Sequence, residues 1–301
     1  MTGPEFNNRP QLSVVIATIE PWPVLKECLN SLLEQVQAVD GEVIIADGNG
    51  QALPVETVFS NVVWLPEIGA SVFRLRALGL QKARGDIVAF TEDHCIVAPD
   101  WSKRIIELHH TFPESVVISG VIENGATDSI LDWVHFLMSK GPCMRPIKSG
   151  ETDLIAGEAN TSFKKHIISS NLSDADTGRP FYERLQRQGH RFLIHDSLMV
   201  WHIQSLGFKG CCQIHFHNGR TIAGFRRAHL SLSLRIARLA SCAVLPAFLV
   251  MKTVMTVFQK RRQRLVVLLG LPFLMLIAAC HATGEFIGYL WGPGTSPQKV
   301  N

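Results

Sequence analysis

The chain has 301 residues and a mass of 33.4 kDa, enough for one large α/β domain or for a smaller domain followed by a second segment. Hydrophobic residues make up 47% and charged residues 18%, which excludes a disordered chain, and the mean hydropathy of +0.16 favours a membrane-bound segment. The formal net charge of +3 gives no reason to expect a nucleic-acid partner. Seven cysteines without Cys-x-x-Cys spacing argue against a disulfide framework or a structural zinc site, and indicate a reducing compartment.

Two buried strands and a helix are expected near the N-terminus. Residues 12–17 form a largely apolar run rich in β-branched residues, which predicts a strand that ends at Thr18-Ile19-Glu20-Pro21. Pro23 opens a helix in which six apolar residues recur at helical spacing, namely Leu25, Cys28, Leu29, Leu32, Leu33 and Val36. Residues 42–46 predict a second strand that ends at the turn-forming Asp47-Gly48-Asn49-Gly50.

Further along, the same alternation of strand and helix continues. Residues 61–65 predict a short third strand, and residues 71–84 predict a helix stopped by Gly85. Residues 86–90 predict a fourth strand that runs directly into Thr91-Glu92-Asp93-His94. Strands and helices that alternate in this way indicate an α/β domain with a mostly parallel sheet.

Polar residues follow three of the predicted strands. These residues are Thr18 with Glu20, Asp47 with Asn49, and the run Glu92-Asp93-His94. Ligand-binding loops collect at the carboxyl ends of parallel strands, so the three groups are expected to meet at one edge of the sheet. They therefore predict a binding site there.

The run Glu92-Asp93-His94 indicates a divalent metal. Carboxylate oxygens suit Mg²⁺ or Mn²⁺, and an imidazole nitrogen shifts the preference toward Mn²⁺. Such a cation typically bridges a diphosphate and neutralises charge on a leaving group. The alternative is that Glu92 and Asp93 form surface ion pairs with Arg74 or Arg84, each contributing about 0.5 kcal/mol.

Two long apolar stretches lie near the C-terminus. Residues 239–258 contain one charged residue, Lys252, and residues 265–284 contain only His281 and the Cys280 thiol as titratable groups. Each is long enough to cross about 30 Å of hydrocarbon, so we expect membrane attachment, with two buried helices of a soluble core as the alternative. Basic residues precede the first stretch and also fill the link between the two, so a membrane-crossing hairpin and an interfacial position both remain open. No signal peptide is expected, because the first apolar run is short.

The N-terminal motifs resemble the GT-A domain of family-two glycosyltransferases, which use nucleotide-diphosphate sugars. The resemblance rests on LSVVIATIEPWPVLKECLNSLLEQ, EVIIADGNG and GASVFRLRALGLQKARGDIVAFTEDHCIVAPDW, in order from Leu12 to Trp101. Residues 155–164 are similar to the family's acceptor-side segment, and residues 184–191 with 200–202 to its closing helix and strand. The resemblance implies a GT-A (Rossmann-like) domain over residues 1–227, followed over 228–301 by a membrane-associated region with two transmembrane helices.

The resemblance also implies roles for individual residues. Thr18 and Glu20 would lie at the nucleotide base and ribose, and Asp47 with Asn49 would hold the uracil or its equivalent. Arg76 would face the diphosphate. Glu92-Asp93-His94 occupies the family's Asp-x-Asp position, so we expect Asp93 and His94 to bind the metal and Glu92 to contact the ribose or the metal. His202 is a further candidate for a metal or phosphate contact.

Inversion at the anomeric carbon requires a base that removes the proton of the acceptor hydroxyl. Family members place it just before the Arg-Leu helix, and here Asp176 is the first candidate and Glu183 the second. Glu123 is the third, although contact with the donor sugar or the acceptor suits it better. The family's usual acidic pair is absent before Arg184, and Asp176 could equally be a turn or helix-capping residue.

The predicted function is sugar transfer from a nucleotide-diphosphate sugar to a lipid-linked saccharide or other envelope glycan precursor. The enzyme would be membrane-attached, inverting and dependent on Mn²⁺ or Mg²⁺, with its catalytic domain on the cytoplasmic face. Membrane attachment suggests the acceptor, because it confines the enzyme to the leaflet that holds a lipid-linked substrate. The alternative is a catalytically degenerate family member that binds a nucleotide sugar or a partner protein.

Overall fold

The computed structural model describes residues 9–50, 61–154, 156–168 and 177–300, which form two compact units. The α/β unit comprises the described parts of Met1–Glu123 and Ile147–His202, and the helical unit comprises Asn124–Pro146 and the described part of Ile203–Asn301. The sequence suggests a boundary near residue 227, whereas this division groups residues 203–227 with the C-terminal helices.

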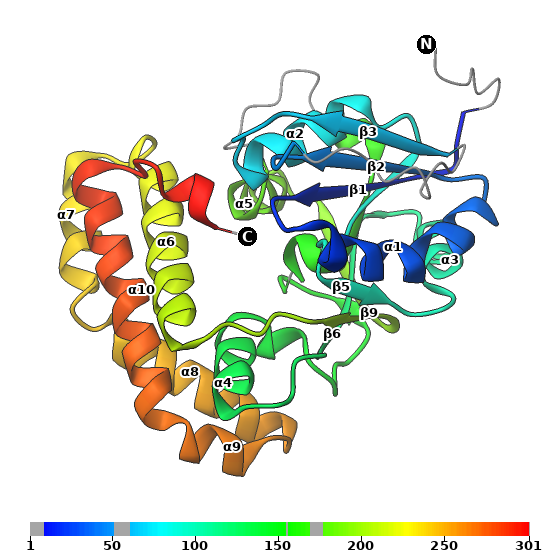
Figure 1. Cartoon of the computed structure of the whole chain (residues 1–301). Coiled ribbons are helices and arrows are strands. Elements are labelled where there is room, and N and C mark those ends of the chain that lie inside the picture. The colour runs from blue at the N-terminus through cyan, green and yellow to red at the C-terminus, as the bar shows by residue number, and fades with distance from the viewer. Residues whose placement is uncertain (1–8, 51–60, 155, 169–176, 301) are drawn as a thin grey trace. The chain divides into compact units, whose positions relative to one another are not determined.

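The α/β unit is built on one sheet that contains nine strands within the described residues, in the order β3-β2-β1-β4-β8-β6-β9-β5 with β7 beside β9 (Figure 1). The strands are β1 (Leu12–Thr18), β2 (Glu42–Asp47), β3 (Val62–Pro66), β4 (Ile87–Phe90), β5 (Cys95–Val97), β6 (Ser115–Asn124), β7 (Gly150–Glu151), β8 (Thr161–Lys164) and β9 (Arg191–His202).

The first four strands form the parallel part of this sheet, with β1 between β2 and β4 and with β3 outside β2. Strand β8 pairs antiparallel with both β4 and β6, and β9 pairs antiparallel with β5 and β7. The predicted α/β fold class is confirmed. Because β1, β2 and β4 run in the same direction, the loops that follow them meet at one edge of the sheet.

Helices cover both faces of the sheet. The helices of this unit are α1 (Trp22–Gln37), α2 (Val72–Lys82), α3 (Trp101–Thr111) and α5 (Arg179–Arg187), with short 3₁₀ turns η3 (Gly157–Ala159) and η4 (Lys165–Ile167). Helices α2 and α5 share a core with β1, β4 and β8 that includes Val15, Phe90 and Phe163, whereas α1 and α3 lie together on the other face (Figure 1). The six apolar residues predicted for the first helix are the buried residues of α1.

The helical unit contains α4 (Ile130–Ser139), α6 (Phe208–Arg227), α7 (Leu232–Ser241), α8 (Leu245–Lys260), α9 (Arg264–Leu269) and α10 (Leu271–Trp291), with 3₁₀ turns η2 (Gly141–Cys143) and η6 (Ser296–Lys299). Helices α6 and α10 pack closely because glycines face the partner backbone. A Cβ atom at Gly219 would overlap the carbonyl oxygen of His281, and one at Gly284 would overlap that of Phe216. This backbone contact explains why α6 belongs to the helical unit.

The C-terminal apolar stretches fold with breaks that their composition does not reveal. The stretch 239–258 is interrupted between α7 and α8, which are bent by 64°, and the stretch 265–284 is divided at Gly270. Pro246 and Pro272 lie in the first turns of α8 and α10, where proline starts a helix readily. Among the described helices, α10 alone is long and apolar enough to cross a membrane, and α7 with α8 would qualify as one broken span.

Candidate active site

The loops after β1 and β2 bring together four of the predicted residues. Thr18 and Asp47 are paired positions of β1 and β2, and both side chains are buried. The Thr18 hydroxyl accepts a hydrogen bond from the Glu20 amide at 3.3 Å, and the Asn49 side-chain amide donates to the Glu20 carbonyl at 2.6 Å. Asp47 accepts from the Asn49 amide at 2.8 Å, which stabilises the turn after β2.

The run Glu92-Asp93-His94 forms a buried turn directly after β4. The Glu92 carbonyl accepts hydrogen bonds from the Cys95 amide at 3.0 Å and from the Cys28 thiol at 3.5 Å. Burial, together with the charge of Asp93, raises the pKa of the Cys28 thiol, which therefore stays protonated as a donor. Strand β5 begins at Cys95 and pairs with β9 so that Cys95 lies opposite His202. This pairing places the side chain of His202 next to that of His94.

Glu92, His94 and His202 converge on one point. The Nε2 atoms of His94 and His202 lie 3.0 Å apart, and the Oε2 atom of Glu92 lies 3.6 Å from the first and 3.3 Å from the second. Ligands about 2.1 Å from a metal ion and at right angles to each other are separated by about 3 Å, and tetrahedral ligands by about 3.5 Å. The three buried side chains therefore have the donor set and spacing for a divalent cation.

Asp93 lies beside this group and faces the other nitrogen of His94. Its Oδ1 atom is 2.7 Å from His94 Nδ1, and its side chain is fully buried. A carboxylate at this distance accepts a hydrogen bond from Nδ1–H, which leaves the Nε2 lone pair of the neutral imidazole available for a metal ion. We call Glu92, His94 and His202 the metal-binding group because their ligand atoms are close enough to hold a metal ion, and the expected role of Asp93 as a ligand beside His94 stays a prediction.

Arg76 lies between two acidic side chains. From α2 its guanidinium reaches Glu92 at 3.6 Å and Glu158 at 3.7 Å, and it lies over the Phe73 ring at 5.9 Å from the centroid. The Arg76 side chain is only 9% exposed, so both carboxylates restrict its orientation. Arg76 thus borders the metal-binding group, and its contact with a diphosphate stays a prediction.

Glu158 was not singled out by sequence reasoning. It lies within residues 155–164, which are similar to the family's acceptor-side segment. The sequence around a single carboxylate does not show which distant residue it contacts. Its Oε2 atom contacts Arg76, and its charge together with burial raises the pKa of Tyr182 well above the usual value. Glu158 and Tyr182 therefore extend the polar site from Arg76 toward α5.

The three candidate bases have different positions. Asp176 lies outside the described residues. Glu183 is on α5 and pairs with Arg179 at 2.9 Å, with its side chain 34% exposed. Glu123 is half-buried near the end of β6. The role of each of the three stays a prediction.

Comparisons with known proteins identify the family of this chain. The family model described as glycosyl transferase family 2 matches residues 13–165, just over half of the chain. Polypeptide N-acetylgalactosaminyltransferase 12 of Mus musculus is 26% identical over an alignment of 142 residues that covers 44% of this chain and 23% of that protein. The chain therefore spans about a quarter of this relative. A crystal structure of GalNAc-T7 with UDP, GalNAc and Mn²⁺ has a TM-score of 0.49 and 16% identity, and the match covers 66% of this chain and 45% of that one. Because the family model matches just over half of the chain, the chain belongs to glycosyl transferase family 2.

Proposed function

We propose that this protein is a membrane-attached, metal-dependent, inverting glycosyltransferase that transfers a sugar from a nucleotide-diphosphate sugar to a lipid-linked or other envelope glycan acceptor. The observation that carries the proposal is the buried group of Glu92, His94 and His202, with Arg76 at its border. Two imidazole nitrogens that lie 3.0 Å apart beside a carboxylate oxygen form a donor set that suits a divalent cation.

The metal would be held by Glu92, His94 and His202. Its chemistry would be to neutralise the charge that develops on the diphosphate leaving group. Two imidazole nitrogens favour Mn²⁺ over Mg²⁺, which prefers oxygen ligands. Asp93 keeps the His94 ring in the orientation and tautomer that this role needs.

The remaining residues orient the donor and the acceptor. Thr18, Glu20, Asp47 and Asn49 would bind the nucleoside, and Arg76 would bind the diphosphate with the five N–H donors of its guanidinium. As the acceptor oxygen bonds to the anomeric carbon and the diphosphate leaves, a base removes the acceptor proton. Asp176 is the first candidate for that base, followed by Glu183 and Glu123.

Membrane attachment is supported by the surface of the helical unit. Helix α10 has the length of a membrane span, and only 39% of its most apolar window is buried. Large apolar side chains are exposed on several helices of this unit, including Leu232 and Ile236 on α7, Met251 on α8 and Leu265 on α9. Exposed apolar side chains on several helices of one unit suit contact with lipid. A lipid-linked acceptor on the cytoplasmic face would be presented to the enzyme in the same leaflet.

Carbonate washing tests the membrane part of the proposal. Membranes that carry the full-length chain should retain it in the pellet, as they retain an integral protein. Recovery of the chain in the supernatant would contradict a spanning region and favour attachment at the interface through the arginine-rich segments.

The transfer reaction is tested with the full-length protein in detergent and a panel of nucleotide sugars. Release of nucleoside diphosphate should require Mn²⁺, stop with EDTA, and fall at least about 100-fold in His202→Ala. His195→Ala is the matched control, since His195 is on the same strand and hydrogen-bonds to Ser197 at 2.8 Å. Donor binding without release for any sugar would instead support the degenerate alternative.

A further inference from the structure

A pocket lined by charged residues and histidines lies in the α/β unit, at the opposite end of β4 from the Glu92 turn. It has a volume of about 520 Å³ and is lined by Ile87, the first residue of β4, and by Lys164, the last residue of β8. Ile87 and Lys164 are paired positions of the two strands. At roughly 3.3 Å per extended residue, Glu92 is up to roughly 17 Å along the chain from Ile87. The pocket is therefore separate from the candidate active site.

Most of the charged residues that line this pocket are basic. Arg9, Lys164 and Lys165 supply three positive charges, and among the described lining residues the one carboxylate is that of Asp86. Three histidines, His109, His110 and His166, complete the polar lining. With the histidines neutral, the lining has an excess of two positive charges, which favours an anionic ligand.

The basic side chains are held in position by backbone carbonyls. The Lys164 ammonium donates to the Pro113 carbonyl, and that of Lys165 donates to the Leu80 carbonyl at 2.6 Å. Arg9 donates to the Arg84 carbonyl at 3.0 Å and pairs with Asp86 at 2.7 Å. An ammonium has three N–H donors, so each lysine keeps donors for a ligand after its carbonyl contact. The carbonyl contacts thus position the two lysine charges without neutralising them, whereas the charge of Arg9 is paired with that of Asp86.

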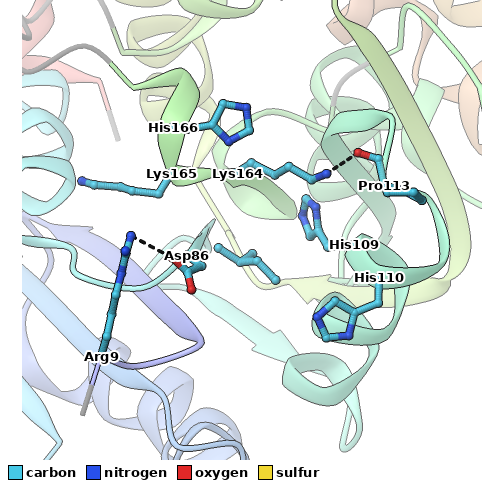
Figure 2. Close-up of a pocket in the computed structure, with 9 residues that line it drawn as sticks. Arg9, Asp86, His109, His110, Pro113, Lys164, Lys165 and His166 are labelled. Atoms are coloured by element: carbon cyan, nitrogen blue, oxygen red, sulfur yellow. Dashed lines mark hydrogen bonds and ion pairs between the residues drawn. The ribbon is translucent and has the colours of Figure 1, made fainter.

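Figure 2 shows that these groups lie on two sides of the pocket. Lys164 extends toward Pro113 beside His109 and His110, whereas Lys165 extends toward the side on which Arg9 lies, with Asp86 between the two sides. One orthophosphate is small compared with a cavity of about 520 Å³ that has cations on both sides. A ligand with two linked phosphoryl groups matches this distribution better.

His109 provides an independent observation. Its side chain is 3% exposed, its Nε2 atom is 3.0 Å from the Ser162 hydroxyl, and its Nδ1 atom has no hydrogen-bond partner among the described residues. Buried polar atoms without a partner are rare in folded proteins and indicate a bound molecule or water. A residue that lines this pocket therefore has a buried nitrogen with unused hydrogen-bonding capacity.

We propose that this pocket binds a ligand that carries a diphosphate group, either soluble or attached to a lipid. The contacts are ion pairs and hydrogen bonds from Lys164, Lys165 and Arg9, which charge-assisted bonding makes strong. Because the pocket is separate from the Glu92 turn, the ligand is bound there and not transformed.

The first experiment measures pyrophosphate binding to the full-length protein in detergent by calorimetry, with EDTA present so that the metal site stays unloaded. Lys164→Gln and Lys165→Gln should each weaken binding about tenfold or more, and Asp86→Asn should strengthen it several-fold, since it removes the opposing charge. Lys103→Gln is the control, because Lys103 is on α3 with its side chain 72% exposed and does not line the pocket. Orthophosphate should bind at least about tenfold more weakly than pyrophosphate.

The second experiment separates the two sources of the diphosphate. Phosphatidylcholine vesicles with and without farnesyl diphosphate are compared for binding of wild type and the same variants. A diphosphate-dependent increment that falls in Lys164→Gln and Lys165→Gln supports the proposal with a lipid-borne ligand, even where pyrophosphate does not bind.

Melting temperatures of the lysine variants show whether loss of the carbonyl contacts unfolds them. Asp86→Asn keeps those contacts and provides the test if the lysine variants do not fold. Absence of binding for both probes overturns the proposal, as does binding that is the same in wild type, Asp86→Asn and Lys103→Gln.

Discussion

Replacing Asp93 by asparagine tests whether Asp93 binds the metal ion itself or orients His94, which binds it. The Asp93 carboxylate lies 2.7 Å from His94 Nδ1 and is fully buried, whereas the metal-binding group consists of Glu92, His94 and His202. Asparagine has nearly the same volume, so the fold should persist, but it removes the charge that favours the Nδ1–H tautomer. The variant should therefore bind Mn²⁺ more weakly without losing the site.

The magnitude follows from this position. Loss of a carboxylate that orients a metal-bound histidine typically reduces metal affinity 10- to 100-fold, which is about 1.4 to 2.7 kcal/mol. Removal of a direct ligand, as in His202→Ala, should cost more than Asp93→Asn does. Titration of Mn²⁺ into the full-length protein, followed by the electron paramagnetic resonance signal of the free ion, measures both values.

Two results would refute the reasoning. An Mn²⁺ affinity of Asp93→Asn equal to that of wild type would mean that the contact with His94 does not orient the ring. A loss as large as that of His202→Ala would mean that Asp93 is itself a ligand, as the resemblance to the family implies. Circular dichroism of both variants provides the check that each is folded.

Three further predictions concern the base, the helix packing and pH. Asp176→Asn should lower kcat by roughly two to four orders of magnitude with the donor KM unchanged. If Asp176→Asn has wild-type turnover and Glu183→Gln loses it, Glu183 is the base. Gly284→Ala should lower the melting temperature, because overpacking against the Phe216 carbonyl costs about 1–3 kcal/mol. Gly210→Ala is the control and should not lower it, since the new Cβ atom meets only Leu206 at 3.5 Å. Equal melting temperatures of the two variants would contradict the close α6–α10 contact. Burial, with Lys164 and His110, lowers the pKa of His109 to about 3, so the stability that neutral His109 contributes is present above pH 6.5 and is lost as the pH falls. At pH 4.5 the loss is about 3 kcal/mol, and the melting temperature of wild type should fall more than that of His109→Gln between pH 7 and 4.5; parallel curves would argue against it.

Several elements could be predicted from the sequence because their signals are local. The apolar run 12–17 and the turn residues 47–50 lie within a few residues of the strands β1 and β2 that they define. The buried face of α1 likewise follows from a spacing that repeats within one helix. The polar groups after β1, β2 and β4 could be placed at one edge because the direction of parallel strands is implied by the helices between them.

The membership of the metal-binding group depended on tertiary structure. His94 and His202 are separated by 108 residues, and they meet only because β5 pairs with β9 in the register that places Cys95 opposite His202. Glu158 likewise contacts Arg76 only because the fold brings together two segments that are far apart in the sequence. Patterns within a short stretch of sequence cannot predict such long-range contacts.

The C-terminal helices show the same division between local and non-local information. By itself, the sequence determined that residues 239–258 and 265–284 are apolar enough for a membrane, because hydropathy is a sum over neighbouring residues. Only the tertiary structure decided that the first stretch bends between α7 and α8 and that α6 packs against α10 through Gly219 and Gly284. Such contacts depend on how closely two backbones can approach, and that distance is set by both partners together and not by either segment alone.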